Sequence, residues 1–296
     1  MSQNLSNWYS LMFSGQVRKL VGQEESYLRK YTTPITNKEA EQGFLDSIGR
    51  VRARKVLGIS EPISPTNIDH LRRRIDKQEY EVTLYIPERQ IESVINDPRS
   101  LYAQRVVEAL NVETDRVIVD AALADVWVGQ KGENLINAAA DGVMVVDATG
   151  GLTVAKLNEI NENFIDNSVL KQGGQMKRLM PITGSEHTSL MSQTQLTSGD
   201  YTHMYPNDTG EIQRVMGIDL IKYAGNEDDP VITVESGVRR SFVMAQDAIA
   251  LWVSRDIECR FEKRNDLHKT WQVQATFVIG AVRQEGKFIQ EVRTTA

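Results

Sequence analysis

Residues 97–128 read DPRSLYAQRVVEALNVETDRVIVDAALADVWV, and this pattern predicts one long helix. Asp97 is a favourable N-cap, and Pro98 suits the first helical position because the missing N–H needs no partner there. No glycine or proline follows until Gly129, so a helix of about 30 residues, or about 45 Å, is expected. Its apolar stripe consists of Tyr102, Val106, Leu110, Val117, Ala121, Ala124 and Val128. The residues assigned to its solvent-facing side are Asp97, Arg99, Arg105, Glu108, Glu113, Asp115 and Arg116.

Ahead of this helix, residues 49–77 carry a concentrated positive charge. They contain eight Lys/Arg and three acids, a net charge of +5, whereas the whole chain is at −6. The remainder of the chain therefore carries −11. A basic segment on an acidic body is a charge distribution through which copies of one protein can attract each other.

The basic segment is expected to lie on a protruding hairpin with arms at 44–55 and 79–86. Apolar and polar residues alternate over 79–86, as they do in a strand with one apolar face. The connection contains the turn residues Gly58, Pro62 and Pro65, and its length of about twenty residues is long for a compact domain. Such a loop is expected to become ordered against another molecule.

Composition places the chain among globular proteins of one large domain or two ordinary ones, with 296 residues, 41% of them hydrophobic and 25% charged. No apolar run reaches the ~18 residues of a membrane helix, and the N-terminus has no signal-peptide pattern. Cys259 is the only cysteine, which excludes an internal disulfide and fits synthesis in a reducing cytoplasm. A sequence pI of 5.4 argues against general nucleic-acid binding by the whole surface.

The first twenty-one residues predict an amphipathic helix, because apolar residues recur at steps of three and four. These residues are Leu5, Trp8, Tyr9, Met12, Phe13, Val17, Leu20 and Val21. Docking on the core of its own subunit and docking on a neighbouring subunit or assembly partner both remain open. The polar stretch 32–41 is expected to be an extended tether.

The middle and the C-terminal part mix helices and strands. A helix is predicted over 153–167, with Val154, Leu157, Ile160 and Phe164 on its buried face. Further short elements are expected at 143–146, 179–183, 186–193, 216–223 and 241–253. The last forty residues predict strands, and residues 284–287 predict a tight hairpin into 288–292.

The sequence contains no candidate catalytic, cofactor-binding or metal site. His70, His187, His203 and His268 are scattered, and none lies at metal-ligand spacing from another histidine or an acid. Cys259 lies on the apolar face of its predicted strand, beside Ile257 and Phe261, and is assigned to the core. Glycines 150 and 151 could form an anion site at a helix N-terminus, but a plain turn and cap is favoured.

The run Arg72-Arg73-Arg74 has three interpretations. A nucleic-acid patch is disfavoured, because no aromatic residues for base stacking are interleaved with the arginines. A solvated charged face stays open, and contact with an acidic protein surface is favoured over it.

In their order along the chain, these elements resemble the major capsid proteins of tailed double-stranded DNA phages, which have the Hong Kong 97 fold. The similarity extends to short sequence segments that occur in the family's order across residues 12–292. They are His70-Leu71-Arg72-Arg73-Arg74 with Tyr80-Glu81, Asp97-Pro98-Arg99-Ser100-Leu101-Tyr102-Ala103-Gln104, Gly151-Leu152-Thr153-Val154-Ala155-Lys156-Leu157, Leu196-Thr197-Ser198-Gly199-Asp200-Tyr201, Ser254-Arg255-Asp256-Ile257 and Ile279-Gly280-Ala281-Val282-Arg283.

The resemblance implies an α+β, HK97-like capsid fold with four parts. These are an N-arm (1–42), an extended loop called the E-loop (43–88), a peripheral P-domain (89–150 and 255–296) and an axial A-domain (151–254). The P-domain would contain a spine helix at about 98–128 and the C-terminal strands.

The function implied by the resemblance is that of a major capsid protein without catalytic activity. It would self-assemble into an icosahedral shell around the double-stranded DNA genome of a tailed bacteriophage, reside in the virion and be made and assembled in the host cytoplasm. Implied partners are many copies of itself in hexamers and pentamers, packaged DNA bound without sequence specificity, and scaffold, portal and decoration proteins, with no cofactor and no membrane. Intersubunit contacts are expected from Arg50, Arg52, Arg54, Arg72, Arg73 and Arg74. A Lys–Asn cross-link with its catalytic Glu, which some members form, cannot be placed on this sequence.

Two alternatives remain. An encapsulin-type bacterial nanocompartment shell shares the fold but encloses a cargo enzyme, and the quoted segments fit the phage family better. An unrelated enzyme or small-molecule binding protein is the other.

Overall fold

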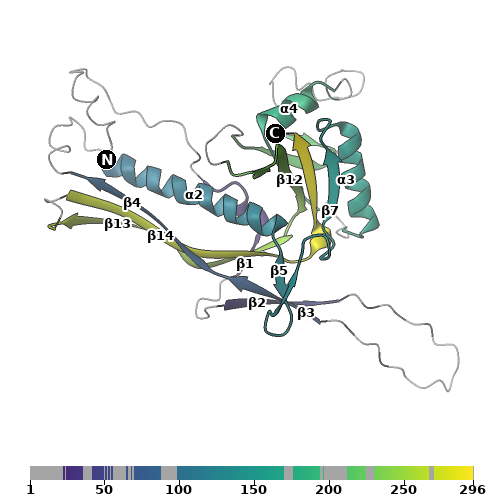
Figure 1. The fold of residues 1–296 in the computed structure, drawn as a ribbon, viewed down its shortest axis with the longest axis horizontal. Helices are drawn as coiled ribbons and strands as arrows, with labels where there is room; N and C mark the ends of the chain where they lie inside the picture. The colour runs from purple at the N-terminus through teal and green to yellow at the C-terminus, as the bar shows by residue number, and fades with distance from the viewer. Residues whose placement is uncertain are drawn as a thin grey trace.

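The computed structural model is an α+β fold built from three sheets, with helix α2 (Arg99–Leu123) lying along one of them (Figure 1). This fold class is the predicted one. The structure describes residues 23, 25–35, 42–49, 51, 53, 55, 65, 68, 70–87, 99–169, 176–193, 196, 212–224, 230–266 and 270–295.

The first sheet, with strand order β1-β13-β14-β4, is the platform for α2. Its strands are β1 (Thr33–Ile35), β4 (Gln78–Ile86), β13 (Ile249–Arg264) and β14 (Thr270–Arg283). Val106 and Leu110 of α2 are each 1% exposed and share an apolar cluster with Val273, Ala275 and Phe277 of β14. The buried positions predicted for the middle of the helix are thus confirmed.

Helix α2 ends earlier than the sequence predicts. It contains 25 residues and is about 37 Å long. The expected end at Val128 is wrong, because Val126–Val128 forms strand β5 and Ala124 is exposed. Pairing of β5 with two other strands outweighs the helical spacing of these residues. The predicted start at Asp97 and Pro98 lies outside the described residues.

Two acids assigned to the solvent-facing side of α2 are buried, which corrects that expectation. Glu108 is 6% exposed and Asp115 is 0% exposed. A buried carboxylate needs donors, and Asp115 receives them from the segment that precedes η2 (Arg29–Tyr31) and from β10 (Ile218–Lys222) and its continuation. The donors are the side chains of Gln23, Ser26 and Tyr223 and the backbone amides of Tyr27 and Leu28. Residue 23 and residues 25–35, part of the expected tether included, are therefore docked on their own subunit.

The third sheet has the order β2-β3-β5-β6 and contains the hairpin. Its strands are β2 (Gln42–Ile48), β3 (His70–Asp76), β5 (Val126–Val128) and β6 (Asn134–Ile136). The hairpin arm expected at 79–86 is wrong, because β4 pairs with β14 and not with β2. The apolar face of β4 is covered by α2 in the first sheet, a contact that alternation alone cannot predict because it defines a face and not a partner.

The second sheet has the order β7-β15-β12-β8-β10-β9, with β11 paired to β12. Its other strands are β7 (Met144–Ala148), β8 (Arg178–Ile182), β9 (Arg214–Val215), β11 (Val234–Glu235), β12 (Val238–Ala245) and β15 (Ile289–Thr295), and it is accompanied by α3 (Val154–Asp166) and α4 (Gly184–Met191). The predicted helix at 153–167 is confirmed: Thr153 caps α3 by accepting from the Lys156 amide at 3.3 Å, and all four predicted apolar residues are buried.

The expected hairpin between β14 and residues 288–292 is wrong. Strand β15 pairs with β12 and β7, because both edges of β14 are already occupied by β13 and β4. The chain therefore passes through η3 (Gly286–Phe288) from the first sheet into the second. The second sheet contains strands from both sides of the boundaries expected at 150 and 255, and the division into P-domain and A-domain stays a prediction.

Candidate functional site

The candidate functional surface is the β2–β3 hairpin, which carries the arginine run. Figure 1 shows the hairpin on one side of the platform sheet and α2 on the other. Arg72, Arg73 and Arg74 lie opposite Asp46, Leu45 and Phe44 in the antiparallel register. Successive strand residues point to opposite faces, so the side chains of Arg72 and Arg74 share one face and Arg73 points the other way.

Arg72 lies on the outward face and is 42% exposed. Its guanidinium donates two hydrogen bonds to Asp46, with Nε 2.6 Å from Oδ1, and it lies 5.3 Å from the centre of the Phe44 ring. The hydrogen bond from Arg72 lowers the pKa of Asp46, so the carboxylate stays charged. Arg72 therefore joins the two strands of the hairpin and keeps part of its surface accessible to another molecule.

Arg74 shares this face but is more enclosed, with 21% of its side chain exposed. Its Nη2 is 2.8 Å from the carboxylate of Asp76, and its guanidinium lies 4.9 Å from the ring of Trp127. A further hydrogen bond reaches the carbonyl oxygen of Gly132 at 3.3 Å. Arg74 therefore fastens β3 to the β5–β6 turn of its own subunit.

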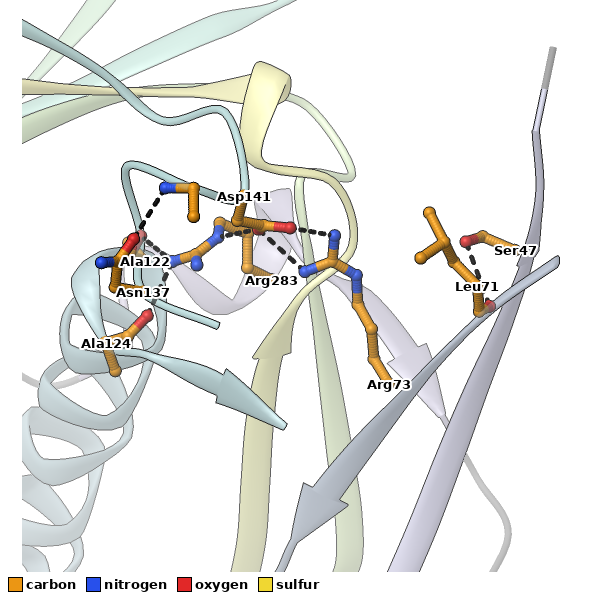
Figure 2. A network of polar contacts seen from close by, with 9 residues as sticks. Ser47, Leu71, Arg73, Ala122, Ala124, Asn137, Asp141 and Arg283 are labelled. Carbon is orange, nitrogen blue, oxygen red and sulfur yellow. Dashed lines mark hydrogen bonds and ion pairs between the residues drawn. The ribbon is translucent and has the colours of Figure 1, made fainter. Parts of the chain in front are cut away.

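Arg73 is buried, which corrects the expectation that the three arginines form one exposed surface. Its side chain is 3% exposed, and its two terminal nitrogens donate to the two oxygens of Asp141 at 2.9 and 2.5 Å (Figure 2). Its charge is used inside the subunit because β3 turns this side chain toward the body. Of the three arginines, Arg72 and, to a smaller extent, Arg74 keep exposed surface.

Asp141 also binds a second arginine, and sequence reasoning missed both residues. Arg283 is 0% exposed; its Nε lies 2.8 Å from Asp141, and its Nη1 donates to the carbonyl oxygens of Ala122 and Ala124 (Figure 2). Burial lowers the pKa of Arg283, although Asp141 opposes this shift. A signal was present, because Arg283 continues the odd-numbered apolar face that Val273 and Ile279 define, and a charge at such a position requires a buried acid.

Several large apolar side chains on and near the hairpin are exposed, which the charge count did not reveal. They are Phe44 at 40%, Ile48 at 70%, Val51 at 52%, Ile68 at 42% and Leu71 at 45% exposure. Phe44 and Ile48 lie on the same face as Arg72, and Leu71 lies on the opposite face. Exposed apolar side chains grouped in this way are typical of interaction surfaces. The three remaining candidate contact residues, Arg50, Arg52 and Arg54, lie outside the described residues.

Among the described residues, no group of three or more His, Cys, Asp and Glu side chains could hold a metal ion. The described helices include none with the length and apolarity needed to cross a membrane.

Comparison with known proteins gives a match over nearly the whole chain. Residues 5–293 match a family described as phage capsid protein. No curated protein matches the sequence.

Solved capsid structures share the fold at low sequence identity. The capsid of cyanophage P-SCSP1u superposes with a TM-score of 0.73 at 13% identity, over 96% of this chain and 92% of that one. The mature capsid of bacteriophage PhiM1 gives 0.71 at 10% identity, over 96% and 91%. The capsid of Ralstonia phage GP4 gives 0.70 at 11% identity, over 96% and 94%.

Proposed function

The chain belongs to the family of phage capsid proteins, and from this we propose that it builds the icosahedral shell around the double-stranded DNA genome of a tailed bacteriophage. It is a major capsid protein of HK97-like α+β fold and a component of the virion. The observation that carries the proposal is the family match over residues 5–293, which spans the helix, the hairpin and all three sheets.

Contacts between subunits are proposed for the outward face of the hairpin. Arg72 offers a half-exposed guanidinium there, with the exposed side chains of Phe44 and Ile48 beside it. An acidic surface on the adjacent subunit is the partner that fits such a face, because the remainder of the chain carries an excess of acids. Arg50, Arg52 and Arg54 are proposed to extend the same contact.

The acidic body suits a wall that encloses DNA without adhering to it. The chain has a net charge of −6, so phosphate groups are repelled by its average surface. DNA is therefore proposed as a packaged content held without sequence specificity. We further propose assembly in the host cytoplasm with the help of scaffold, portal and decoration proteins, and a role that involves no catalysis.

Electron microscopy of the purified protein tests this function directly. Closed icosahedral particles are expected from the expressed protein, alone or together with its assembly partners. Native particles should protect DNA from nuclease, whereas a nanocompartment of the encapsulin type would hold a cargo protein and no genome. The family match does not favour that alternative. Native particles that contain cargo protein and no DNA would overturn the proposal.

A further inference from the structure

Three segments that are distant in sequence meet at the side chain of Asp141, which is 7% exposed. Arg73 comes from the hairpin strand β3, and Arg283 comes from the end of β14. Arg283 also binds the carbonyl groups of Ala122, in the last turn of α2, and of Ala124, just after the helix. The hairpin, the platform sheet and the C-terminus of the long helix are therefore connected through a single carboxylate (Figure 2).

The loop that carries Asp141 is itself held in place. The backbone carbonyl oxygen of Asn137 accepts a hydrogen bond from the Asp141 amide at 3.0 Å, and the side-chain oxygen of Asn137 accepts one from the Ala140 amide at 2.7 Å. On the other side, the backbone oxygen of Asp141 lies so close to Gly286 that any side chain at position 286 would collide with it. The carboxylate is thus a fixed point against which the hairpin can be oriented.

As a source of stability, this triad is poor. Two guanidinium groups face one carboxylate, which leaves a net positive charge in a buried position. Arg73 Nε and Arg283 Nη2 are buried, and the described residues provide no hydrogen-bond acceptor for them. Replacing a buried group of charges by apolar residues is often neutral or stabilising, so stability does not account for this arrangement.

As a source of direction, the triad is effective. The fork of Arg73 binds both oxygens of Asp141, and a bidentate contact fixes orientation as well as distance. The other polar connections of β3 to the body are single hydrogen bonds to the β5–β6 turn, from Arg74 to Gly132, from Arg72 to Gln130 and from the Gly129 amide to Arg72. Ile75 adds an apolar contact with Val128 and Trp252, and the ladder between β3 and β5 has a single register pair, Arg73 with Val128. Adjacent strands vary in twist by tens of degrees, so a ladder this short does not define one angle.

We propose that Asp141, with Arg73 and Arg283, is a positioning group for shell assembly that sets the direction in which the hairpin leaves the body. The proposal rests on the capsid function, because a hairpin that contacts a neighbour must leave each subunit at the same angle. Asp141 is buried within its own subunit and acts through Arg73.

The test measures the hairpin direction in unassembled full-length subunits. In a Cys259→Ala background, spin labels are placed at cysteines introduced for Ile48 on β2 and Asp166 at the end of α3, both exposed. Pulsed electron paramagnetic resonance then gives the distance distribution between hairpin and body. The variants are Arg73→Met, which keeps an apolar stem of similar length, and a triple variant with Arg73→Met, Asp141→Leu and Arg283→Met. The matched control is Asp46→Asn, which weakens the ion pair within the hairpin and leaves the hydrogen bond from Arg72 to Gln130 of the body in place.

Both Arg73→Met and the triple variant should broaden or shift the distance distribution, and the control should leave it as in the wild type. The melting temperature of the triple variant should be unchanged or higher, while the fraction of closed, uniform shells falls. An unchanged distance distribution in both Arg73→Met and the triple variant would overturn the inference. A failure of both variants to fold would also overturn it, since the triad would then be required for stability. The distances are measured on subunits, so a wild-type protein that forms no shells would refute the capsid function and leave this result standing.

Discussion

Asp115 shows how a single buried charge can determine the path of a distant segment. A carboxylate at 0% exposure in the middle of α2 must be surrounded by donors, and four residues of the N-terminal segment supply them together with Tyr223. Burial and then the nearby Asp115 charge raise the pKa of Tyr223, so its hydroxyl group remains a donor. The segment that leads to β1 is therefore bound in its own subunit, and any reach toward a neighbour is left to residues before it.

Asp115→Asn should release this segment. The amide offers one acceptor and turns a donor toward other donors, so a loss of about 2–3 kcal/mol in the free energy of unfolding is expected. Residues 25–35 should also become accessible to protease, which mass spectrometry of the fragments detects. The control is Asp120→Asn on the exposed side of the same helix, which should change neither quantity. Equal behaviour of the two variants would show that the contact to Asp115 does not hold the segment.

Glu291 on β15 should make stability depend on pH. Its side chain is 4% exposed; burial raises its pKa, but hydrogen bonds from Arg240 and Arg293 outweigh burial and lower it overall. The folded pKa is below the unfolded value of about 4.3, so the unfolded state binds more protons as pH falls through this range. The stabilisation is thus complete above about pH 4.3 and is lost as pH falls through the folded pKa.

Urea unfolding of the wild type and Glu291→Gln at several pH values measures this effect. The wild type should be more stable by about 1–3 kcal/mol near neutral pH, and the difference should shrink toward zero in acid. A stability difference that is constant with pH would show that Glu291→Gln destabilises the protein for a reason other than the loss of the negative charge.

At the scale of elements, α2 depends on the sheet beneath it. Its buried face at Val106, Leu110 and Ile118 joins two apolar clusters, one shared with β14 and one that continues into β12 and β13. Most helical stability in proteins comes from such packing and not from intrinsic propensity. Damage to the face or to the backbone of α2 is therefore expected to affect folding before it affects assembly.

Leu110→Ala should lower the free energy of unfolding by about 2–5 kcal/mol, because the side chain is 1% exposed and its removal leaves a cavity. Ala109→Pro should cost about 3 kcal/mol or more by removing a backbone hydrogen bond in the helix interior. Both should give insoluble protein, and Ala109→Ser at the same exposed position should remain soluble. Recovery of well-folded soluble subunits from the proline variant would contradict a continuous helix in the core.

At the scale of the whole molecule, the positive charge of the hairpin is smaller than a count along the chain suggests. Asp46 and Asp141 lie outside the counted stretch 49–77, and each pairs with one of its arginines. Arg74 pairs with Asp76 inside the stretch. Each of the three arginines of β3 is thus paired with an acid of its own subunit, and Arg72 keeps the largest exposed fraction of the three.

A charge exchange separates the contact within the hairpin from the proposed contact between subunits. Arg72→Glu should weaken assembly, but it removes both contacts at once. The double variant Asp46→Arg with Arg72→Asp restores an opposite-charge pair across the strands and leaves the net charge unchanged. Folded subunits that do not form shells are expected from it, and wild-type shells should loosen as salt rises. Normal assembly of the double variant would show that Arg72 serves only its own hairpin.

Local sequence was sufficient for much of the fold. The apolar spacing of Val154, Leu157, Ile160 and Phe164 and the cap at Thr153 predicted α3 correctly, because both depend on residues within a few positions of each other. The alternation in β4 and β14 and the buried middle of α2 were predicted for the same reason. The order of these elements was enough to indicate a capsid fold.

Only the tertiary structure decided which elements meet. Alternation assigns a face to a strand but no partner, so the pairing of β4 with β14 and of β15 with β12 and β7 could not be derived from the chain. The same holds for the charges, because Asp115 and Arg73 read as solvent-facing until the donors and acceptors that bury them are in place. Hydrophobic period is a local property, whereas strand pairing and the compensation of a buried charge depend on residues far apart in sequence, and these contacts exist only once the chain has folded.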